Sequence, residues 1–246
     1  AVKRVTGERE KELALREAAA AFGVELDGVA AAKMVALLAM VGRANERFRL
    51  TAITAWEEAL AKHLLDSLAP LALGLMPAAE GRAADLGSGA GFPGLVLAIA
   101  LPRVSFTLIE ATQKKAAFLA MAAEELGLAN VRVWAARAEE VGRAQGREAF
   151  PLVTARAVAP LPVLLELAHP LLCPGGRLLA WKGPEAPREI EAASSALGVL
   201  GAEVSSLTPY ELPGGYGRRF LLVLEKTRPT PAGFPRRPGM AAKKPL

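Results

Sequence analysis

The ten residues from Asp85 to Gly94, Asp-Leu-Gly-Ser-Gly-Ala-Gly-Phe-Pro-Gly, have the composition of a ligand-binding turn. Glycines between a strand and a helix let the backbone approach a ligand closely, because they have no Cβ. Turns of this kind occur in enzymes that bind nicotinamide or flavin dinucleotides and in methyltransferases. The glycines alone therefore do not identify the ligand.

The details of the turn separate these possibilities. The dinucleotide pattern G-x-G-x-x-G, counted from Gly87, requires glycine where the chain has Phe92. Counted from Gly89 it fits formally, but it then places Pro93 in the helical turn whose N–H groups would bind a pyrophosphate, and proline has no N–H. S-adenosylmethionine has no phosphate, and an acid followed by G-x-G-x-G resembles the loop of methyltransferases that use it. We therefore predict an S-adenosylmethionine site at this turn, which includes Asp85 and Gly89.

Two acidic positions follow at the ends of later strands. Glu110 stands 19 residues after Gly91, near the spacing of about 20 at which a carboxylate accepts hydrogen bonds from ribose hydroxyls. A solvated acid is the alternative, and the upstream glycine turn favours the ligand role. Ala138 and Glu139 either cover an adenine edge or form an ordinary helix start, where acids favour the positive end of the helix dipole.

Three cations are predicted at the same edge of the sheet. Arg156 ends the fourth strand, Lys182 ends the fifth, and Arg219 begins an antiparallel last strand. Strand ends at this edge surround the ligand in such folds, so the three side chains can converge on a polyanion. The alternative for Arg156 is a pair with a nearby acid, and each cation alone would be an ordinary surface charge.

Common catalytic groups of methyltransferases are missing from the expected places. The fourth strand ends Thr-Ala-Arg-Ala-Val, without the Asp/Asn-Pro-Pro-aromatic loop typical of enzymes that methylate exocyclic amines. The single cysteine, Cys173, lies in a predicted structural turn and cannot serve as the nucleophile of cytosine C5 methylation. His63, with Asp66 three residues later, is more typical of a packed residue. This favours an acceptor that already has a free lone pair, such as guanine N7, which needs no general base.

The elements that must position these residues alternate between strands and helices after Glu80. This pattern predicts an α/β fold of the Rossmann-like, class I methyltransferase type, with a mostly parallel seven-stranded sheet. A short Pro-Gly-Gly-Tyr-Gly connection predicts a final hairpin and an antiparallel last strand. The predicted strands are 83–86, 104–109, 131–135, 152–155, 177–181, 203–210 and 220–225, and the predicted helices are 94–100, 114–126, 138–145, 161–172 and 187–200.

Both ends of the chain differ from this alternating core. Residues 1–80 are predicted to form a helical N-terminal extension, with helices at 8–22, 30–47 and 56–73 and Pro70 bending or ending the last one. Residues 81–227 form the predicted core. Residues 228–246 are rich in proline and basic residues, and we predict no fixed structure for them.

Composition narrows the class of protein. The net charge is +5, but six basic residues and no acids follow Glu225, which leaves the rest of the chain at −1. A basic RNA-binding face must therefore be local. One cysteine excludes an internal disulfide, and with only two histidines and no second cysteine we predict no metal site. No signal peptide or uninterrupted membrane span is evident, which indicates a cytoplasmic protein.

Five segments in order carry a more specific resemblance. They are Lys-His-Leu-Leu-Asp-Ser-Leu (62–68), the turn 85–94, Lys-Lys-Ala-Ala-Phe-Leu (114–119), Ala-Arg-Ala (155–157) and Trp-Lys-Gly (181–183). Together they resemble the glucose-inhibited division protein B family, the bacterial 16S ribosomal RNA guanine-N7 methyltransferases, over roughly residues 30 to 226. One departure is Arg49, where the family usually has asparagine.

The resemblance implies S-adenosylmethionine as methyl donor and N7 of a guanine in the 530 loop of 16S ribosomal RNA as acceptor. It also implies action on the small ribosomal subunit, and we expect a monomer. Lys182 and Arg219 match basic positions associated with RNA, and Arg156 is a further candidate for positioning the substrate. Gly87, Phe92, Glu110, Ala138, Glu139 and Arg156 match cofactor-binding positions, and we add the adjacent Ala111 and Thr112.

Three other functions remain open from the sequence. One is a methyltransferase that acts on a small molecule or a protein. A second is a nicotinamide-dependent oxidoreductase, which Phe92 and Pro93 disfavour. The third is a non-catalytic RNA-binding or ribosome assembly factor that has kept the fold.

Overall fold

The computed structural model describes residues 7–76 and 80–246, which contain one seven-stranded sheet in the order β3-β2-β1-β4-β5-β7-β6. Neighbouring strands from β3 to β5 are parallel, whereas β7 is antiparallel to both β5 and β6. The predicted mostly parallel sheet with an antiparallel last strand is confirmed. The strands are β1 (Gly81–Leu86), β2 (Val104–Ile109), β3 (Val131–Trp134), β4 (Phe150–Arg156), β5 (Leu172–Lys182), β6 (Ala202–Leu212) and β7 (Gly217–Lys226).

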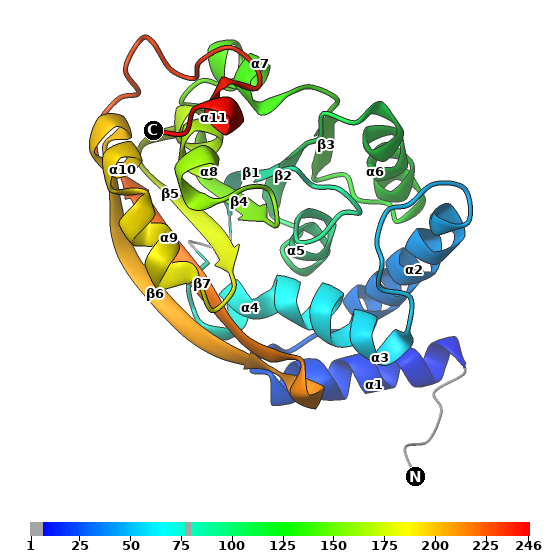
Figure 1. Ribbon diagram of the computed structural model, residues 1–246. Coiled ribbons are helices and arrows are strands. Elements are labelled where there is room, and N and C mark those ends of the chain that lie inside the picture. The colour runs from blue at the N-terminus through cyan, green and yellow to red at the C-terminus, as the bar shows by residue number, and fades with distance from the viewer. Residues whose placement is uncertain (1–6, 77–79) are drawn as a thin grey trace.

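Helices cover both faces of this sheet, as its two apolar faces require (Figure 1). One face packs against α1, α2, α4, α5 and α6, and the other against α7, α8 and α10, while α11 packs on α8. The helices are α1 (Glu8–Ala21), α2 (Gly28–Asn45), α3 (Trp56–Ala59), α4 (Asp66–Ala72), α5 (Gly94–Ala100), α6 (Gln113–Glu125), α7 (Ala138–Arg143), α8 (Leu161–Ala168), α9 (Ala186–Ala192), α10 (Ser194–Leu200) and α11 (Met240–Lys243), and a π-helical turn, Leu60–Leu65, joins α3 to α4.

The N-terminal helices share a hydrophobic core with the sheet. Leu15 of α1, Met34 of α2 and Leu68 of α4 belong to the same buried cluster as Phe106 of β2. Helix α2 is long and apolar enough to cross a membrane by length and composition, but its buried side chains lie in this cluster. It is a core helix of this fold, and its length is weak evidence for a membrane span.

The C-terminal segment differs from the sequence prediction. Residues 228–246, for which no fixed structure was expected, run across α7 and α8 and end in the short helix α11 (Figure 1). The physical reason is that the core supplies partners that composition does not reveal. Arg236 pairs with the buried Glu166 of α8, and Thr230 and Ala241 are themselves buried.

Candidate active site

Two adjoining clefts open where the parallel strands end. The larger cleft has a volume of about 770 Å³ and the smaller one about 290 Å³. Val158 and Ala159 line both, so the two clefts are neighbours. Ligand sites in open α/β sheets are expected at this edge. The larger cleft is lined by Lys62, His63, Asp66, Arg156, Trp181, Lys182, Glu189 and Arg219, among others, and the smaller one by Gly87, Glu110, Ala111, Ala138, Glu139, Gly239, Ala241 and Ala242, among others.

The glycine turn between β1 and α5 contributes Gly87 to the lining of the smaller cleft. Gly87 has φ +67°, and a Cβ at this position would lie 2.9 Å from Cγ2 of Val158. A side chain here would therefore strain the backbone and collide with Val158. Glycine at this position lets Val158, which lines both clefts, pack directly on the turn.

Glu110, at the end of β2, holds this turn in place. Its carboxylate accepts the N–H of Gly89 at 3.0 Å and the N–H of Thr112 at 2.8 Å. A carboxylate has about four acceptor positions, so two remain for a ligand in the smaller cleft. The arrangement fits the ribose contact that the sequence predicted and adds a structural role. The predicted Thr112 contributes through its backbone.

Asp85 lies beneath the turn. Its side chain is 0 % exposed, and Thr154 donates a hydrogen bond of 2.7 Å to Oδ1. Gly94 leaves the space for Oδ2, since a Cβ there would lie 2.5 Å from it. Burial raises the pKa of Asp85 to about 6. Asp85 lines neither cleft and supports the turn from a buried position, and its contact with a cofactor stays a prediction.

The outer side of the smaller cleft is formed by Ala138 and Glu139 at the start of α7. Glu139 also accepts the N–H of Gly239 from the C-terminal segment at 2.9 Å. Both sequence-based interpretations of this position, adenine cover and ordinary helix start, are compatible with it. The contact with Gly239 was not foreseen, because the partners are 100 residues apart.

Phe92, in the glycine turn, is buried and lines neither cleft. Its ring stacks on His63 with 4.3 Å between ring centres and 4° between ring planes. Nε2 of His63 lies 2.9 Å from Oγ1 of Thr51, and burial together with Arg156 lowers the pKa of His63 to about 4. His63 is therefore a neutral, packed residue at pH 7, as predicted, and it fixes the position of Phe92.

The π-helical turn and the start of α4 contribute Lys62, His63 and Asp66 to the lining of the larger cleft. Pro70 lies within α4 and has no N–H to donate to the carbonyl of Asp66, four residues earlier. The indole N–H of Trp181, in β5, donates to that carbonyl at 2.7 Å instead. Arg156 donates to the carbonyl of Lys62 at 2.8 Å. The helix therefore continues through Pro70, and side chains of β4 and β5 donate to main-chain carbonyls of α4 and the π-helical turn.

Arg156 is paired with Asp66, at 2.7 Å, and its side chain is only 13 % exposed. Tyr210 donates to the other oxygen of Asp66 at 2.6 Å, and burial and this carboxylate raise the pKa of Tyr210. The alternative of an acid-paired arginine is thus the one observed. Sequence reasoning did not foresee Tyr210 as part of this site, and the only signal for Asp66 was its place in the 62–68 segment.

Lys182 is also paired. It is 7 % exposed, and its Nζ donates to Glu189 at 2.7 Å and to the carbonyl of Ala159 at 3.2 Å. Glu189 in turn accepts the N–H of Leu161, the first residue of α8. Lys182 therefore positions the wall that the two clefts share. Glu189 was not predicted, because it lies on the helix after the strand that carries Lys182.

Arg219 completes the predicted trio of cations. All three line the larger cleft, so the predicted convergence is observed. Arg219 donates to the carbonyl of Arg218, and within residues 7–76 and 80–246 it forms no ion pair with an acid. It is therefore the member of the trio whose charge is available to a ligand. The same described residues contain no group of three or more His, Cys, Asp or Glu that could hold a metal ion.

Comparisons with known proteins identify a family and a shared fold. Residues 30–213 match the family model described as rRNA small subunit methyltransferase G. Two relatives have the name ribosomal RNA small subunit methyltransferase G. The one from Deinococcus radiodurans is 45 % identical over 85 % of this chain and 83 % of its own length. The one from Symbiobacterium thermophilum is 44 % identical over 94 % of this chain and 96 % of its own length. A solved structure of a predicted O-methyltransferase from Agrobacterium tumefaciens has a TM-score of 0.51 and 24 % identity over 67 % of this chain and 80 % of that one, which shows the shared fold.

Proposed function

Because this chain belongs to the rRNA small subunit methyltransferase G family, we propose that it transfers the methyl group of S-adenosylmethionine to N7 of a guanine in the 530 loop of 16S ribosomal RNA. The family match carries the proposal, and it spans the glycine turn, Glu110, Arg156 and Lys182. The proposed setting is the cytoplasm, with the small ribosomal subunit as partner and a monomer as the active form.

The smaller cleft suits the cofactor, whose positively charged sulfur supplies an electrophilic methyl group. Gly87 and Glu110 both line it, and Glu110 keeps acceptor positions for ribose hydroxyls. Ala111 and Ala138 add small apolar side chains to its lining. These residues would bind and orient the donor, and none of them needs to change its protonation state.

The larger cleft suits the acceptor base. It shares Val158 and Ala159 with the smaller cleft, so a base bound in it lies beside the donor site. Arg219 supplies the unpaired positive charge at this cleft, which favours a phosphate-bearing substrate. Ala157, with φ +56°, is a strained non-glycine residue in its lining, which is a common feature of functional sites.

The titratable groups of the larger cleft support an acceptor that needs no deprotonation. Asp66 is paired with Arg156, and Glu189 is paired with Lys182, so neither carboxylate is a free base. His63, with a pKa of about 4, is a weak base at neutral pH. Guanine N7 presents its lone pair directly, so positioning rather than proton transfer would account for the rate.

The test is methyl transfer from labelled S-adenosylmethionine to undermethylated small ribosomal subunits, followed by nucleoside analysis of the RNA. We expect label in 7-methylguanosine within the 530 loop. Label in another nucleoside would contradict the N7 assignment. Cofactor binding without label in RNA would contradict the RNA substrate and would favour a small-molecule or protein acceptor, or a non-catalytic assembly factor.

A further inference from the structure

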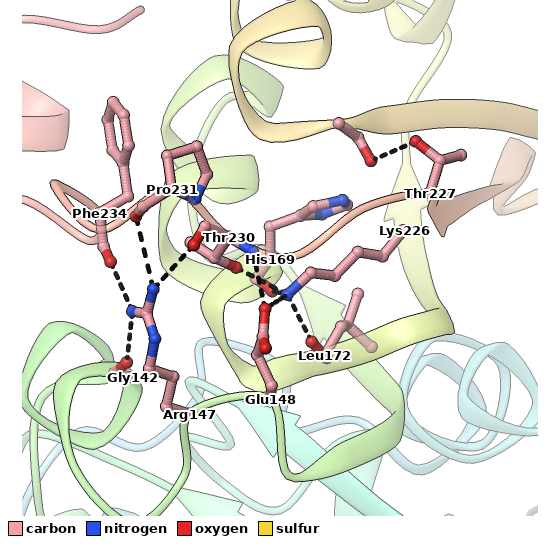
Figure 2. A network of polar contacts seen from close by, with 11 residues as sticks. Gly142, Arg147, Glu148, His169, Leu172, Lys226, Thr227, Thr230, Pro231 and Phe234 are labelled. Atoms are coloured by element: carbon pink, nitrogen blue, oxygen red, sulfur yellow. Dashed lines mark hydrogen bonds and ion pairs between the residues drawn. The ribbon is translucent and has the colours of Figure 1, made fainter.

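The C-terminal segment, residues 228–246, follows a buried lysine at the end of β7. Lys226 is 0 % exposed, and its Nζ donates to Glu148 at 2.8 Å, to Oγ1 of Thr230 at 2.6 Å, and to the carbonyls of Leu172 and His169 at 2.6 and 3.1 Å (Figure 2). A lysine is almost never buried unless its donors are satisfied. This cluster therefore fixes the direction in which the chain leaves β7.

Two arginines on the core then hold the segment by its carbonyls. Arg147 donates to the carbonyl of Phe234 at 2.7 Å and to that of Thr230 at 2.9 Å (Figure 2). Arg143, on α7, donates to the carbonyl of Pro235 at 2.9 Å. These bonds are charge-assisted, and such bonds are stronger than neutral ones. They stop the segment from leaving the surface beside α7.

The third anchor is an ion pair with α8. Nε of Arg236 lies 2.9 Å from Oε1 of Glu166, and its terminal nitrogen lies 2.5 Å from Oε2. The backbone N–H of Arg236 also donates to Glu166 at 2.9 Å. Glu166 is 1 % exposed, so the pair is a planar, two-pronged contact with a buried carboxylate. Like the other two anchors, it lies outside the residues that line either cleft.

The anchored chain ends as part of the smaller cleft. Gly239 donates its N–H to Glu139, and Ala241 is buried. Gly239, Ala241 and Ala242 line the same cleft as Gly87 and Glu110. The family model that the chain matches ends at residue 213, so this wall lies outside the matched region.

We propose that residues 239–242 are a wall of the cofactor site and raise its affinity for S-adenosylmethionine, while the Arg236–Glu166 pair holds this wall in place from outside the cleft. The proposal rests on the proposed function, because it takes the smaller cleft as the cofactor site. Ordering this proline-rich segment loses conformational entropy, and the contacts of the three anchors must offset that loss. A role in cofactor binding would explain why the segment is ordered.

A chain that ends at Pro238 removes the wall but keeps Lys226, Arg147 and Arg236 with their core partners. We expect S-adenosylmethionine to bind this shortened chain at least about tenfold more weakly by isothermal titration calorimetry. The matched control is Lys243→Ala, which changes an exposed residue of the same segment that does not line the cleft, and we expect unchanged affinity.

Hydrogen exchange of the full chain provides a second readout that requires no variant to fold. We expect saturating S-adenosylmethionine to slow amide exchange in residues 239–244. Unchanged exchange there, or equal affinity in the full and the shortened chain, would overturn the inference and leave the proposed function intact. A full chain that binds no S-adenosylmethionine would overturn both.

Discussion

The two clefts at the carboxyl edge of the sheet differ in the charged side chains that bond to their backbone. Around the smaller cleft, carboxylates accept backbone N–H groups, as Glu110 does from Gly89 and Glu139 does from Gly239. Around the larger cleft, Glu189 also accepts an N–H, and cations in addition donate to backbone carbonyls, as Arg156 does to that of Lys62. In both clefts, side chains that the sequence predicts to contact a ligand also form hydrogen bonds with the surrounding backbone.

The difference between the clefts lies in how the charges are compensated. The cations of the larger cleft are paired with acids, Arg156 with Asp66 and Lys182 with Glu189, whereas Arg219 has no such partner among the described residues. Substitutions in the larger cleft should therefore affect folding most strongly where a pair is broken. They should affect RNA binding most selectively at Arg219.

The largest effect is expected for Asp66→Asn. The change leaves Arg156 without a charged partner in a nearly buried position and weakens the bond from Tyr210. Breaking such a pair costs about 3–5 kcal/mol of unfolding free energy. Urea denaturation at neutral pH measures it, and Glu185→Gln, which breaks the exposed pair with Arg188, is the control with little expected change. A loss below about 1 kcal/mol would show that the pair does not hold the larger cleft.

Glu110→Ala should act on the smaller cleft alone. Bonds to a charged group contribute about 1.5–3 kcal/mol, so we expect S-adenosylmethionine to bind roughly 10- to 150-fold more weakly. Binding of the small-subunit RNA should change little, because Glu110 does not line the larger cleft. Glu203→Ala, an exposed acid on β6, is the control. Equal losses of cofactor and RNA affinity would show that the clefts are not independent.

Three buried titratable groups should make the unfolding free energy depend on pH, with opposite signs. Asp85, beneath the turn, has a raised pKa of about 6, so its contribution to stability is present at low pH and is lost as the pH rises through 6. The pKa values of His63 and of His169, which lies just before β5, are lowered to about 4. The contributions of these two histidines to stability are therefore present above about pH 6.5 and are lost as the pH falls through 4.

Between about pH 4.5 and 6 the two histidines therefore make the unfolding free energy fall on acidification, and Asp85 opposes this fall. Asp85→Asn removes the opposing group, so the fall should become steeper, whereas His169→Leu should make it shallower. Urea denaturation across this pH range measures the slope. A variant slope equal to that of the unmodified chain would contradict the assignment of that residue.

The smallest effect is expected for Arg219→Ala. Because Arg219 holds no acid, its loss should leave stability and cofactor affinity unchanged and should weaken RNA binding about three- to tenfold. The slope of log affinity against log salt should fall by about one. Arg218→Ala, which changes the neighbouring exposed arginine that does not line the cleft, is the matched control. An equal loss of RNA affinity in both variants would show that the position of Arg219 in the larger cleft does not matter for RNA binding.

The sequence by itself determined the features that depend on neighbours along the chain. Alternating strands and helices fixed the parallel sheet, the glycines of 85–94 fixed the turn, and the Pro-Gly-Gly connection fixed the antiparallel β7. The ends of several predicted strands and helices differ from those in the structure. β5 begins at Leu172 because it pairs with Phe150 of β4, and the predicted helix 187–200 is divided into α9 and α10.

Only the tertiary structure decided which charges are free and which are used to build the site. Arg156 and Asp66 are 90 residues apart, Trp181 and the carbonyl of Asp66 are 115 apart, and Glu139 and Gly239 are 100 apart. No local pattern encodes such pairs, because they exist only after the elements have packed. For the same reason, composition alone predicted a disordered C-terminal segment, whereas buried acids and core arginines hold it beside the smaller cleft.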